Sequence, residues 1–455
     1  MTTEQAAKEK IFQWVCQPEA TQFIEKIVDH CCTKNEAVAA LASSLERVAS
    51  TRLFDWVDYV SIPYSPNIDD VLDSLGMVEE AASTHYRVYY HPGAQLPRIL
   101  VNDSTEEVYD IAIKVESVPE YLMVRGITGK IEGGAYSGLR RCCLATDNGV
   151  SLWVVERHGY RGIEPVQSND STVKNYLEAK ELWQTRQRTS DDEEGLFANT
   201  LRLVEKIVNI VGRDAASWIV LEVERGYWQA RNFAGQLQKV RQDQLGVGWA
   251  NHDHHTFRSS RKHFEGLVRL FEMLGFHCRE RFYAGQEAGW GAQVMENPQS
   301  GLVLFLDVDL SPEEIEIDFA HQSLPERDHL GTIGLWCALH GDSILQAGMH
   351  HLEAQFQFDL LREDLAEQGV KMMQPFSNFT YLKQAFTQGE RWKVRPEVVE
   401  KLVKAKMISR EEGDRFIRDG AIGSHMENLQ RREGYKGFNQ KNVSTIIRRT
   451  DPRSQ

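Results

Sequence analysis

The strand, helix, strand order that occurs twice in the C-terminal half is the feature that most limits which folds are open to this chain. The first copy consists of a strand, a helix and two more strands, expected at residues 249–257, 261–274, 292–295 and 302–308. The second copy begins at Gly348, with a strand at 349–356 and a helix at 360–368. Two copies of one supersecondary unit predict an α+β domain that arose by duplication.

The N-terminal half has a similar mixed pattern, which lies between two helical stretches. Its strand-like runs alternate with a short helix, and this order predicts another α+β domain. The flanking stretches show helical spacing of apolar residues instead. We therefore expect four parts: a helical cap at 1–54, an α+β domain at 55–167, a helical connector at 168–245 and a second α+β domain at 246–455.

The composition is that of an ordinary globular protein with an acidic balance. Of its 455 residues, 42% are hydrophobic and 26% are charged, which is enough for two or three domains. A net charge of −14 argues against nucleic acid as a partner, because phosphate binding needs clustered Lys and Arg. We find no signal-peptide pattern, no apolar run of about 18 residues and no CxxC spacing among the seven cysteines. These observations predict a cytoplasmic protein without a membrane partner.

Metal-ligand residue types gather on three of the strands expected in the C-terminal domain. They are the histidines of 252–255, the pair His350-His351, and Glu427. Alternate side chains of a strand share a face, so only one member of each adjacent histidine pair can point into a common cavity. Two imidazoles and one carboxylate leave three positions open on an octahedral ion, which suits Fe(II) that binds a bidentate oxo acid together with O2.

Three segments carry a family resemblance: Gly348-Met349-His350-His351-Leu352, Leu365 to Val370, and His425-Met426-Glu427-Asn428-Leu429-Gln430-Arg431. With Asp253-His254 and Gly437-Phe438, they resemble the 4-hydroxyphenylpyruvate dioxygenase family over roughly residues 247–450. The resemblance implies the vicinal oxygen chelate fold, in which tandem βαβββ modules curl round a metal. It also implies His254, His351 and Glu427 as the ligands of one Fe(II), with His255 and His350 as out-of-phase neighbours.

A second family with related chemistry is similar too, the 2-oxoadipate dioxygenase/decarboxylase group, also called hydroxyglutarate synthase. Its H-x-x-x-R strand is matched by the run from His254 to Arg258. This resemblance implies that Arg258 pairs with a substrate carboxylate, for which a guanidinium group is well shaped. The pair Gln430-Arg431 is shared by both families and is expected to support the strand that carries the metal ligand. Arg258 and Gln430 are therefore the candidate catalytic residues beside the ligands.

Two departures from the first family bear on the substrate and on the N-terminal half. The family carries a Q-I-F-T strand before its metal glutamate, whereas residues 415–419 read Arg-Phe-Ile-Arg-Asp, which speaks against 4-hydroxyphenylpyruvate itself. In the N-terminal domain, Tyr59, Asp110 and Leu152 align with the three ligand positions and cannot hold a metal ion in the same way. That domain is expected to be a metal-free duplicate, and the gapless similarity of 155–162 to 430–437 supports a duplication.

The expected function is that of an Fe(II)-dependent dioxygenase that decarboxylates a small 2-oxo acid and hydroxylates the same molecule. The 2-oxo acid, aromatic or dicarboxylic, and O2 are its expected partners, and a homodimer is a further expectation. Three alternatives stay open: an extradiol ring-cleaving dioxygenase, a glyoxalase-type lyase or isomerase with Ni or Zn, and a non-catalytic binding protein on a decayed fold.

Overall fold

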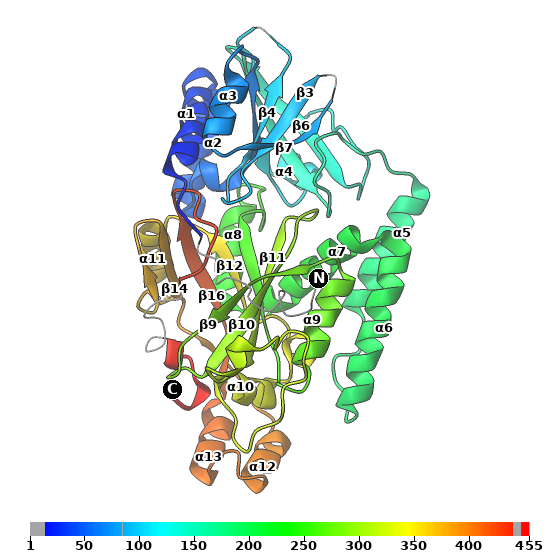
Figure 1. The fold of residues 1–455 in the computed structure, drawn as a ribbon, viewed down its shortest axis with the longest axis vertical. Coiled ribbons are helices and arrows are strands. Elements are labelled where there is room, and N and C mark those ends of the chain that lie inside the picture. Colours follow the sequence, from blue (N-terminus) through cyan, green and yellow to red (C-terminus); the bar gives the residue numbers. More distant parts are fainter. Residues whose placement is uncertain (1–13, 84, 105, 440–446, 455) are drawn as a thin grey trace, which may run out of the picture.

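The computed structural model describes residues 14–83, 85–104, 106–439 and 447–454. The chain forms two β-sheets, one in each half, which lie one above the other in Figure 1. Each sheet is covered by helices, and each has a hydrophobic core of its own. This arrangement confirms the expected α+β class with two domains.

The N-terminal sheet has seven strands in the order β2-β3-β4-β1-β5-β7-β6. The strands are β1 (Val57–Pro63), β2 (Val78–Ala82), β3 (Tyr86–Tyr90), β4 (Arg98–Asn102), β5 (Tyr109–Lys114), β6 (Leu139–Asp147) and β7 (Val150–Arg157). The helices of this half are α1 (Pro18–Lys34), α2 (Glu36–Ala49), α3 (Ile68–Ser74) and α4 (Val118–Arg125). Ile24 of α1 and Leu45 of α2 are buried in the same core as Ile111 of the sheet. The described part of the expected cap is thus a layer of this domain.

The C-terminal sheet has nine strands, and the path through it is β13-β14-β16-β12-β8-β11-β10-β9, with β15 beside β16. The strands are β8 (His252–Arg258), β9 (His277–Tyr283), β10 (Trp290–Asn297), β11 (Leu302–Asp309), β12 (His351–Gln355), β13 (Ser377–Asn378), β14 (Leu382–Phe386), β15 (Glu390–Trp392) and β16 (Ala421–Arg431). Helix α9 (Phe264–Met273) follows β8, and α11 (Phe358–Glu367) follows β12. Each half of the sheet is therefore a βαβββ module, and β8 and β12 pair antiparallel where the two modules meet.

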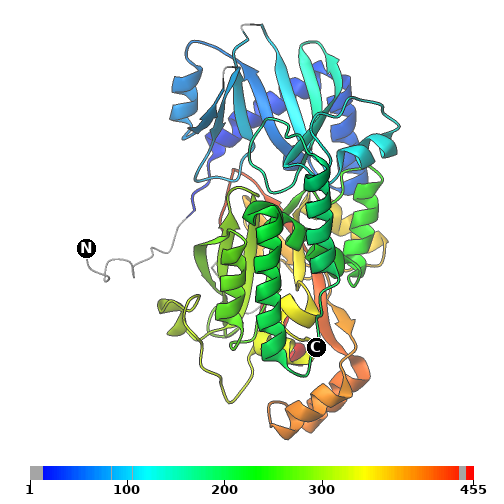
Figure 2. The same cartoon turned by 90° about the vertical axis from the view of Figure 1, so that its right-hand side faces the viewer.

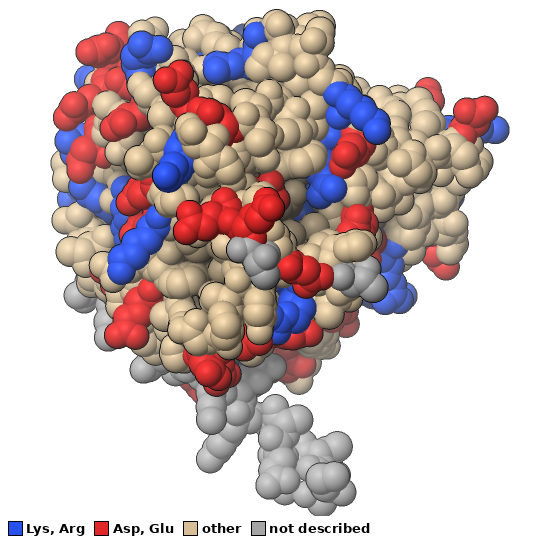
Figure 3. All heavy atoms as spheres, turned by 90° about the horizontal axis from the view of Figure 1, so that it is seen from above, with Lys and Arg blue, Asp and Glu red and all other residues tan. Residues whose placement is uncertain are grey.

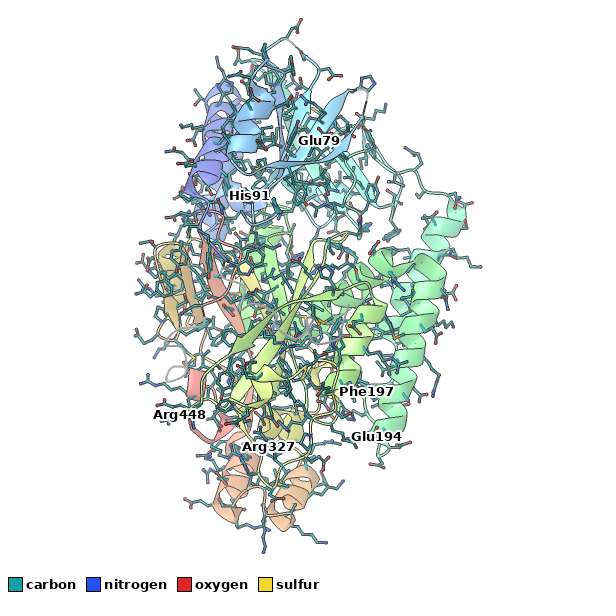
Figure 4. All side chains as sticks on the ribbon, in the orientation of Figure 1. Glu79, His91, Glu194, Phe197, Arg327 and Arg448 are labelled. Carbon is teal, nitrogen blue, oxygen red and sulfur yellow. The ribbon has the colours of Figure 1, made fainter. Side chains whose placement is uncertain are left out.

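The remaining helices flank the C-terminal sheet. They are α5 (Asp170–Gln184), α6 (Glu193–Val211), α7 (Arg213–Gln229), α8 (Phe233–Asp243), α10 (Thr332–His340), α12 (Pro396–Lys404) and α13 (Arg410–Asp419). Helices α5 and α6 run side by side along one flank (Figures 1 and 2). At the lower end of α6, near Glu194, the ring of Phe197 stacks on His263 with centroids 4.9 Å apart (Figure 4). The stretch expected as a connector thus packs on the C-terminal sheet and shares its core.

Two surface properties bear on the expected partners. Over the residues that the structure describes, no helix combines the length and the apolar character needed to span a membrane. On the face of the N-terminal domain seen from above, Lys and Arg side chains are interspersed with Asp and Glu (Figure 3).

Candidate metal centre

A cavity lies where β8, β12 and β16 meet in the C-terminal sheet. The strand register brings one residue from each of these strands into a row, because His254 lies opposite Glu353, and Glu353 lies opposite Glu427. His351 precedes Glu353 by two residues on β12 and therefore faces the same side. All four side chains line the cavity.

The donor atoms of these four residues converge on one point. The Nε2 atom of His254 lies 3.1 Å from Oε1 of Glu353, and Nε2 of His351 contacts the same oxygen. The Nε2 atom of His351 is also 3.6 Å from Oε2 of Glu427. The structure thus brings the three predicted ligands together and adds a second carboxylate between them.

Only one histidine of each adjacent pair lines the cavity, as the alternation of side chains along a strand predicts. His255 does not line the cavity, and its Nε2 atom is 3.4 Å from Nη1 of Arg225 on the other side of the sheet. His350 lies behind His351, and the two Nδ1 atoms are 2.5 Å apart. This contact leaves Nε2 of His351 directed into the cavity.

His254 is held by a buried carboxylate behind it. Its Nδ1 atom lies 2.9 Å from Oδ1 of Asp253, and Arg431 donates two hydrogen bonds to that carboxylate at 2.9 and 3.0 Å. Burial alone would raise the pKa of Asp253, but Arg431 and His254 together hold that pKa well below its usual range. An ionised Asp253 accepts the Nδ1 proton of His254 and leaves Nε2 as a free donor toward the cavity, the arrangement that a metal-binding histidine needs.

Glu427 is oriented by Gln384 of β14, a residue that the sequence analysis missed. The Nε2 atom of Gln384 donates a 2.8 Å hydrogen bond to Oε1 of Glu427. The comparison with residues 415–419 was wrong, because those residues belong to the amphipathic helix α13. The strand that pairs with β16 on the side away from β12 is β14. The end of β14 and the residue after it have the sequence Gln384-Ala385-Phe386-Thr387. The Q-x-F-T signal was present about 30 residues earlier than the position we compared, because α12 and α13 are inserted between β15 and β16.

Glu353 is the second functional residue that the sequence analysis missed. The spacing His351-x-Glu353 on a strand was the available signal, since residues two apart share a face. Burial and the neighbouring Glu427 raise the pKa of Glu353 well above its usual range. Burial also raises the pKa of Glu427 to about 8. The Oε1 atom of Glu353 accepts a 2.6 Å hydrogen bond from Thr256, whereas Oε2 is buried without a partner among the described residues.

This donor set fits a divalent transition metal. Burial lowers the pKa values of His254 and His351, so both imidazoles are neutral ligands. Two carboxylates so close together in a buried site are costly unless a proton or a cation lies between them. The unpartnered Oε2 atom of Glu353 and the nitrogens directed at the same point therefore accommodate a metal ion with mixed nitrogen and oxygen ligands.

The two candidate catalytic residues have different surroundings. Arg258 is buried in the cavity wall, where its Nε atom lies 3.5 Å from Oδ2 of Asp307 on β11. Gln430 does not line the cavity, because it faces away from Glu427 on β16. Its Oε1 atom accepts a 3.0 Å hydrogen bond from the backbone N–H of Phe358 at the start of α11. That contact supports the strand and the helix, and it gives Gln430 no route to a ligand in the cavity.

Aromatic side chains make up most of the remaining cavity wall. The ring of Phe438 packs on His254 with centroids 4.8 Å apart, and Phe305 packs on Phe438 at 5.1 Å. Further aromatic residues of the wall are Phe282, Trp290, Phe376 and Phe386. A predominantly apolar lining with a few polar groups is typical of small-molecule sites.

The N-terminal sheet carries no comparable set at the corresponding positions. Tyr59 lies opposite Ala112, and Ala112 lies opposite Trp153. The residue that corresponds to Glu427 is therefore Trp153 and not Leu152, which packs in the core on the other side of the sheet. Asp110 accepts a 3.0 Å hydrogen bond from the indole N–H of Trp153.

Comparisons with known proteins reach similar architectures only at low identity. No family model and no curated protein sequence matches the chain. Among solved structures, a mutant of 4-hydroxymandelate synthase from Streptomyces coelicolor is 10% identical, with a TM-score of 0.30, and covers 87% of this chain and 98% of its own. Methylmalonyl-CoA epimerase from Mycobacterium tuberculosis is 12% identical, with a TM-score of 0.23, over 40% of this chain and 89% of its own. At such TM-scores these structures add nothing to the geometry described above.

Proposed function

We propose that the protein is an Fe(II)-dependent dioxygenase that acts on a small 2-oxo acid. The observation that carries this proposal is that His254 and His351 both contact Oε1 of Glu353 in the cavity, and that Glu427 lies 3.6 Å from His351. Two neutral imidazoles and a carboxylate are the ligand set that leaves positions open for a chelating substrate and for O2. The sequence resemblance to 4-hydroxyphenylpyruvate dioxygenases supports the same chemistry.

The reaction converts the 2-oxo acid and O2 into CO2 and a hydroxylated acid. One oxygen atom enters the new carboxylate at the former keto carbon, and the other forms a hydroxyl group on the same molecule. Bound Fe(II) would supply the Lewis acid and the electrons that activate O2. The contributions of the chain are position and environment: Asp253 and Gln384 hold two of the ligands in place, and Phe305 and Phe438 exclude water around His254.

The test is oxygen uptake by anaerobically purified protein loaded with Fe(II). A panel of aromatic and dicarboxylic 2-oxo acids is supplied, and O2 consumption and CO2 release are followed together. We expect equal molar amounts of the two with at least one substrate, and neither with Glu427→Gln. If the wild type consumes no more O2 than Glu427→Gln on every member of the panel, the proposed function is wrong.

A second candidate, a glyoxalase-type lyase or isomerase, is favoured by Glu353. If Glu353 binds the metal together with the other three residues, only two positions stay open on an octahedral ion, too few for a chelating acid and O2 together. Metal analysis and the same oxygen assay separate the candidates. A dioxygenase retains iron and turnover in Glu353→Gln, whereas a four-ligand site loses its metal in that variant and consumes no O2 in the wild type.

A further inference from the structure

The end of the cavity near Arg258 contains polar groups that the metal chemistry does not use. The register of three adjacent strands collects them, because Arg258 of β8 lies opposite Asp307 of β11, and Asp307 lies opposite Ala292 of β10. Trp290 is two residues from Ala292 on the same face of β10. Arg258, Asp307 and Trp290 all line the cavity.

These groups are poorly satisfied within the protein. The indole N–H of Trp290 and the Oδ1 atom of Asp307 are buried and have no hydrogen-bond partner in the described chain. Within the described residues, the Arg258 guanidinium has one hydrogen-bond acceptor, Asp307. The distance between the two groups is 3.5 Å, which is at the outer limit of a hydrogen bond. Buried polar atoms without partners are costly, and in a cavity wall they indicate where a ligand makes its hydrogen bonds.

The charge of this end is balanced only when Asp307 is ionised, and burial raises the pKa of Asp307 to about 7 even though Arg258 lies beside it. The positive charge of Arg258 faces the carboxylate of Asp307, and the face of Trp336 covers the guanidinium at 5.5 Å. Asp309, the next acidic residue on this face, is occupied by the backbone N–H groups of Ile333 and Gly334 at 2.9 and 2.8 Å. Above about pH 7 a ligand carboxylate here would meet one guanidinium and one carboxylate at the same time, so its Coulomb attraction would be largely cancelled.

We propose that this end of the cavity selects substrates whose far end is uncharged and both donates and accepts hydrogen bonds. A carboxamide meets these demands, since its NH2 group donates to Oδ1 of Asp307 and its oxygen accepts from Trp290 or Arg258. The inference rests on the proposed function, because the other end of the same molecule is the 2-oxo acid that binds the metal. It replaces the expectation that Arg258 pairs with a substrate carboxylate.

The test compares two nearly isosteric substrates, 4-carbamoylphenylpyruvate and 4-carboxyphenylpyruvate, with phenylpyruvate as reference. At a pH of about 8, where Asp307 is ionised, we expect the Fe(II)-loaded wild type to favour the amide over the carboxylate in kcat/KM by about 10- to 100-fold, mostly through KM. Asp307→Asn removes the negative charge at nearly constant shape, and it should reverse the preference. Trp290→Phe removes only the indole N–H, and it should lower kcat/KM for the amide by a larger factor than for phenylpyruvate.

Three results would overturn the inference while the proposed function stands. They are a wild type that favours the carboxylate, an unchanged preference in Asp307→Asn, and an enzyme that oxidises phenylpyruvate but neither of the pair. If no 2-oxo acid is oxidised at all, the proposed function fails. Anaerobic calorimetry of the same pair with Co(II)-loaded protein then decides the inference, because a preference for the amide that Asp307→Asn reverses supports it and any other order overturns it.

Discussion

The two sheets of this protein share one scaffold and differ in what fills its concave side. In both, an aspartate on the first strand of the sheet's first module is bridged to an arginine at the end of the last strand, Asp58 to Arg157 and Asp253 to Arg431. Both arginines also donate to two backbone carbonyls in the following turn. Conservation of this whole contact pattern within one chain is strong support for a duplication.

The difference begins one residue after each aspartate. Tyr59 follows Asp58 and packs with Ala112 and Trp153, whose ring is covered by Arg141 at 4.8 Å. His254 follows Asp253 and faces the carboxylate of Glu353 in the cavity. The comparison teaches that the sheet and its ion pair are requirements of the fold, whereas the metal site depends on a few inward-facing positions. It also suggests experiments in which each variant has a matched control in the other sheet.

The largest effect is expected from giving the C-terminal site the residue of the N-terminal one. His254→Tyr removes a ligand nitrogen, so bound metal should fall to background and turnover by on the order of 10³-fold or more. Metal analysis and oxygen uptake measure both. The reverse change, Tyr59→His, should leave metal content unaltered because Ala112 and Trp153 offer no further ligands. A gain of one bound metal ion in Tyr59→His would contradict our description of the N-terminal sheet.

A smaller effect is expected from the ion pairs behind these residues. Asp253→Asn keeps the shape of the side chain but weakens its hold on His254 Nδ1, so metal affinity should fall by about 10- to 100-fold. Asp58→Asn breaks the equivalent pair with Arg157 and should lower only the stability, since no metal ligand follows it. Titration with a fluorescent chelator gives the affinity, and urea unfolding gives the stability. Equal metal affinities of the two variants would show that Asp253 has no part in the metal site.

The parts that sequence reasoning could predict are those governed by short-range periodicity. The repeated strand, helix, strand order follows from such periodicity, and the twofold repeat of a strand predicts that only one histidine of each adjacent pair faces the cavity. The family resemblance implied the complete βαβββ module and the choice of His254 over His255. The missed residues depend on which strands become neighbours, and a helical insertion hides that information. Gln384 was overlooked because α12 and α13 separate it from Glu427 by 43 residues. Asp307 was overlooked because only the pairing of β11 with β8 brings it to Arg258.

The internal repeat shows that an alignment of sequence alone can also misplace the register by one residue. A gapless alignment pairs Arg157 with Arg432, yet the residue that makes the contacts of Arg157 is Arg431. The C-terminal copy has one more residue in this turn, where Glu433 adopts a φ of 56° just before Gly434 at 62°. Such a local insertion changes the register by one position, which decides whether a side chain points into or away from the core.

The smallest and most specific effect is expected in the pH dependence of stability, which should separate the two sheets without any assay of turnover. In the metal-free folded protein, burial raises the pKa of Glu427 to about 8, whereas in the unfolded chain this group ionises near 4.5. Between these values the folded state holds a proton that the unfolded state has released, so the free energy of unfolding falls as pH rises and levels off above about 8. Glu353, whose pKa burial also raises, acts in the same direction.

The buried histidines have the opposite sign, because their lowered pKa values make stability rise with pH up to about 6.5. The window that isolates the carboxylates is therefore about pH 6.5 to 8. Urea unfolding in the presence of a chelator should show stability falling across that window in the wild type and much less in Glu427→Gln. The metal-loaded protein should show little fall, because its ligand carboxylates are already deprotonated. Asp110→Asn, the matched change in the N-terminal sheet, should keep the wild-type slope. A wild-type slope that is the same with and without metal would mean that no cation lies between Glu353 and Glu427.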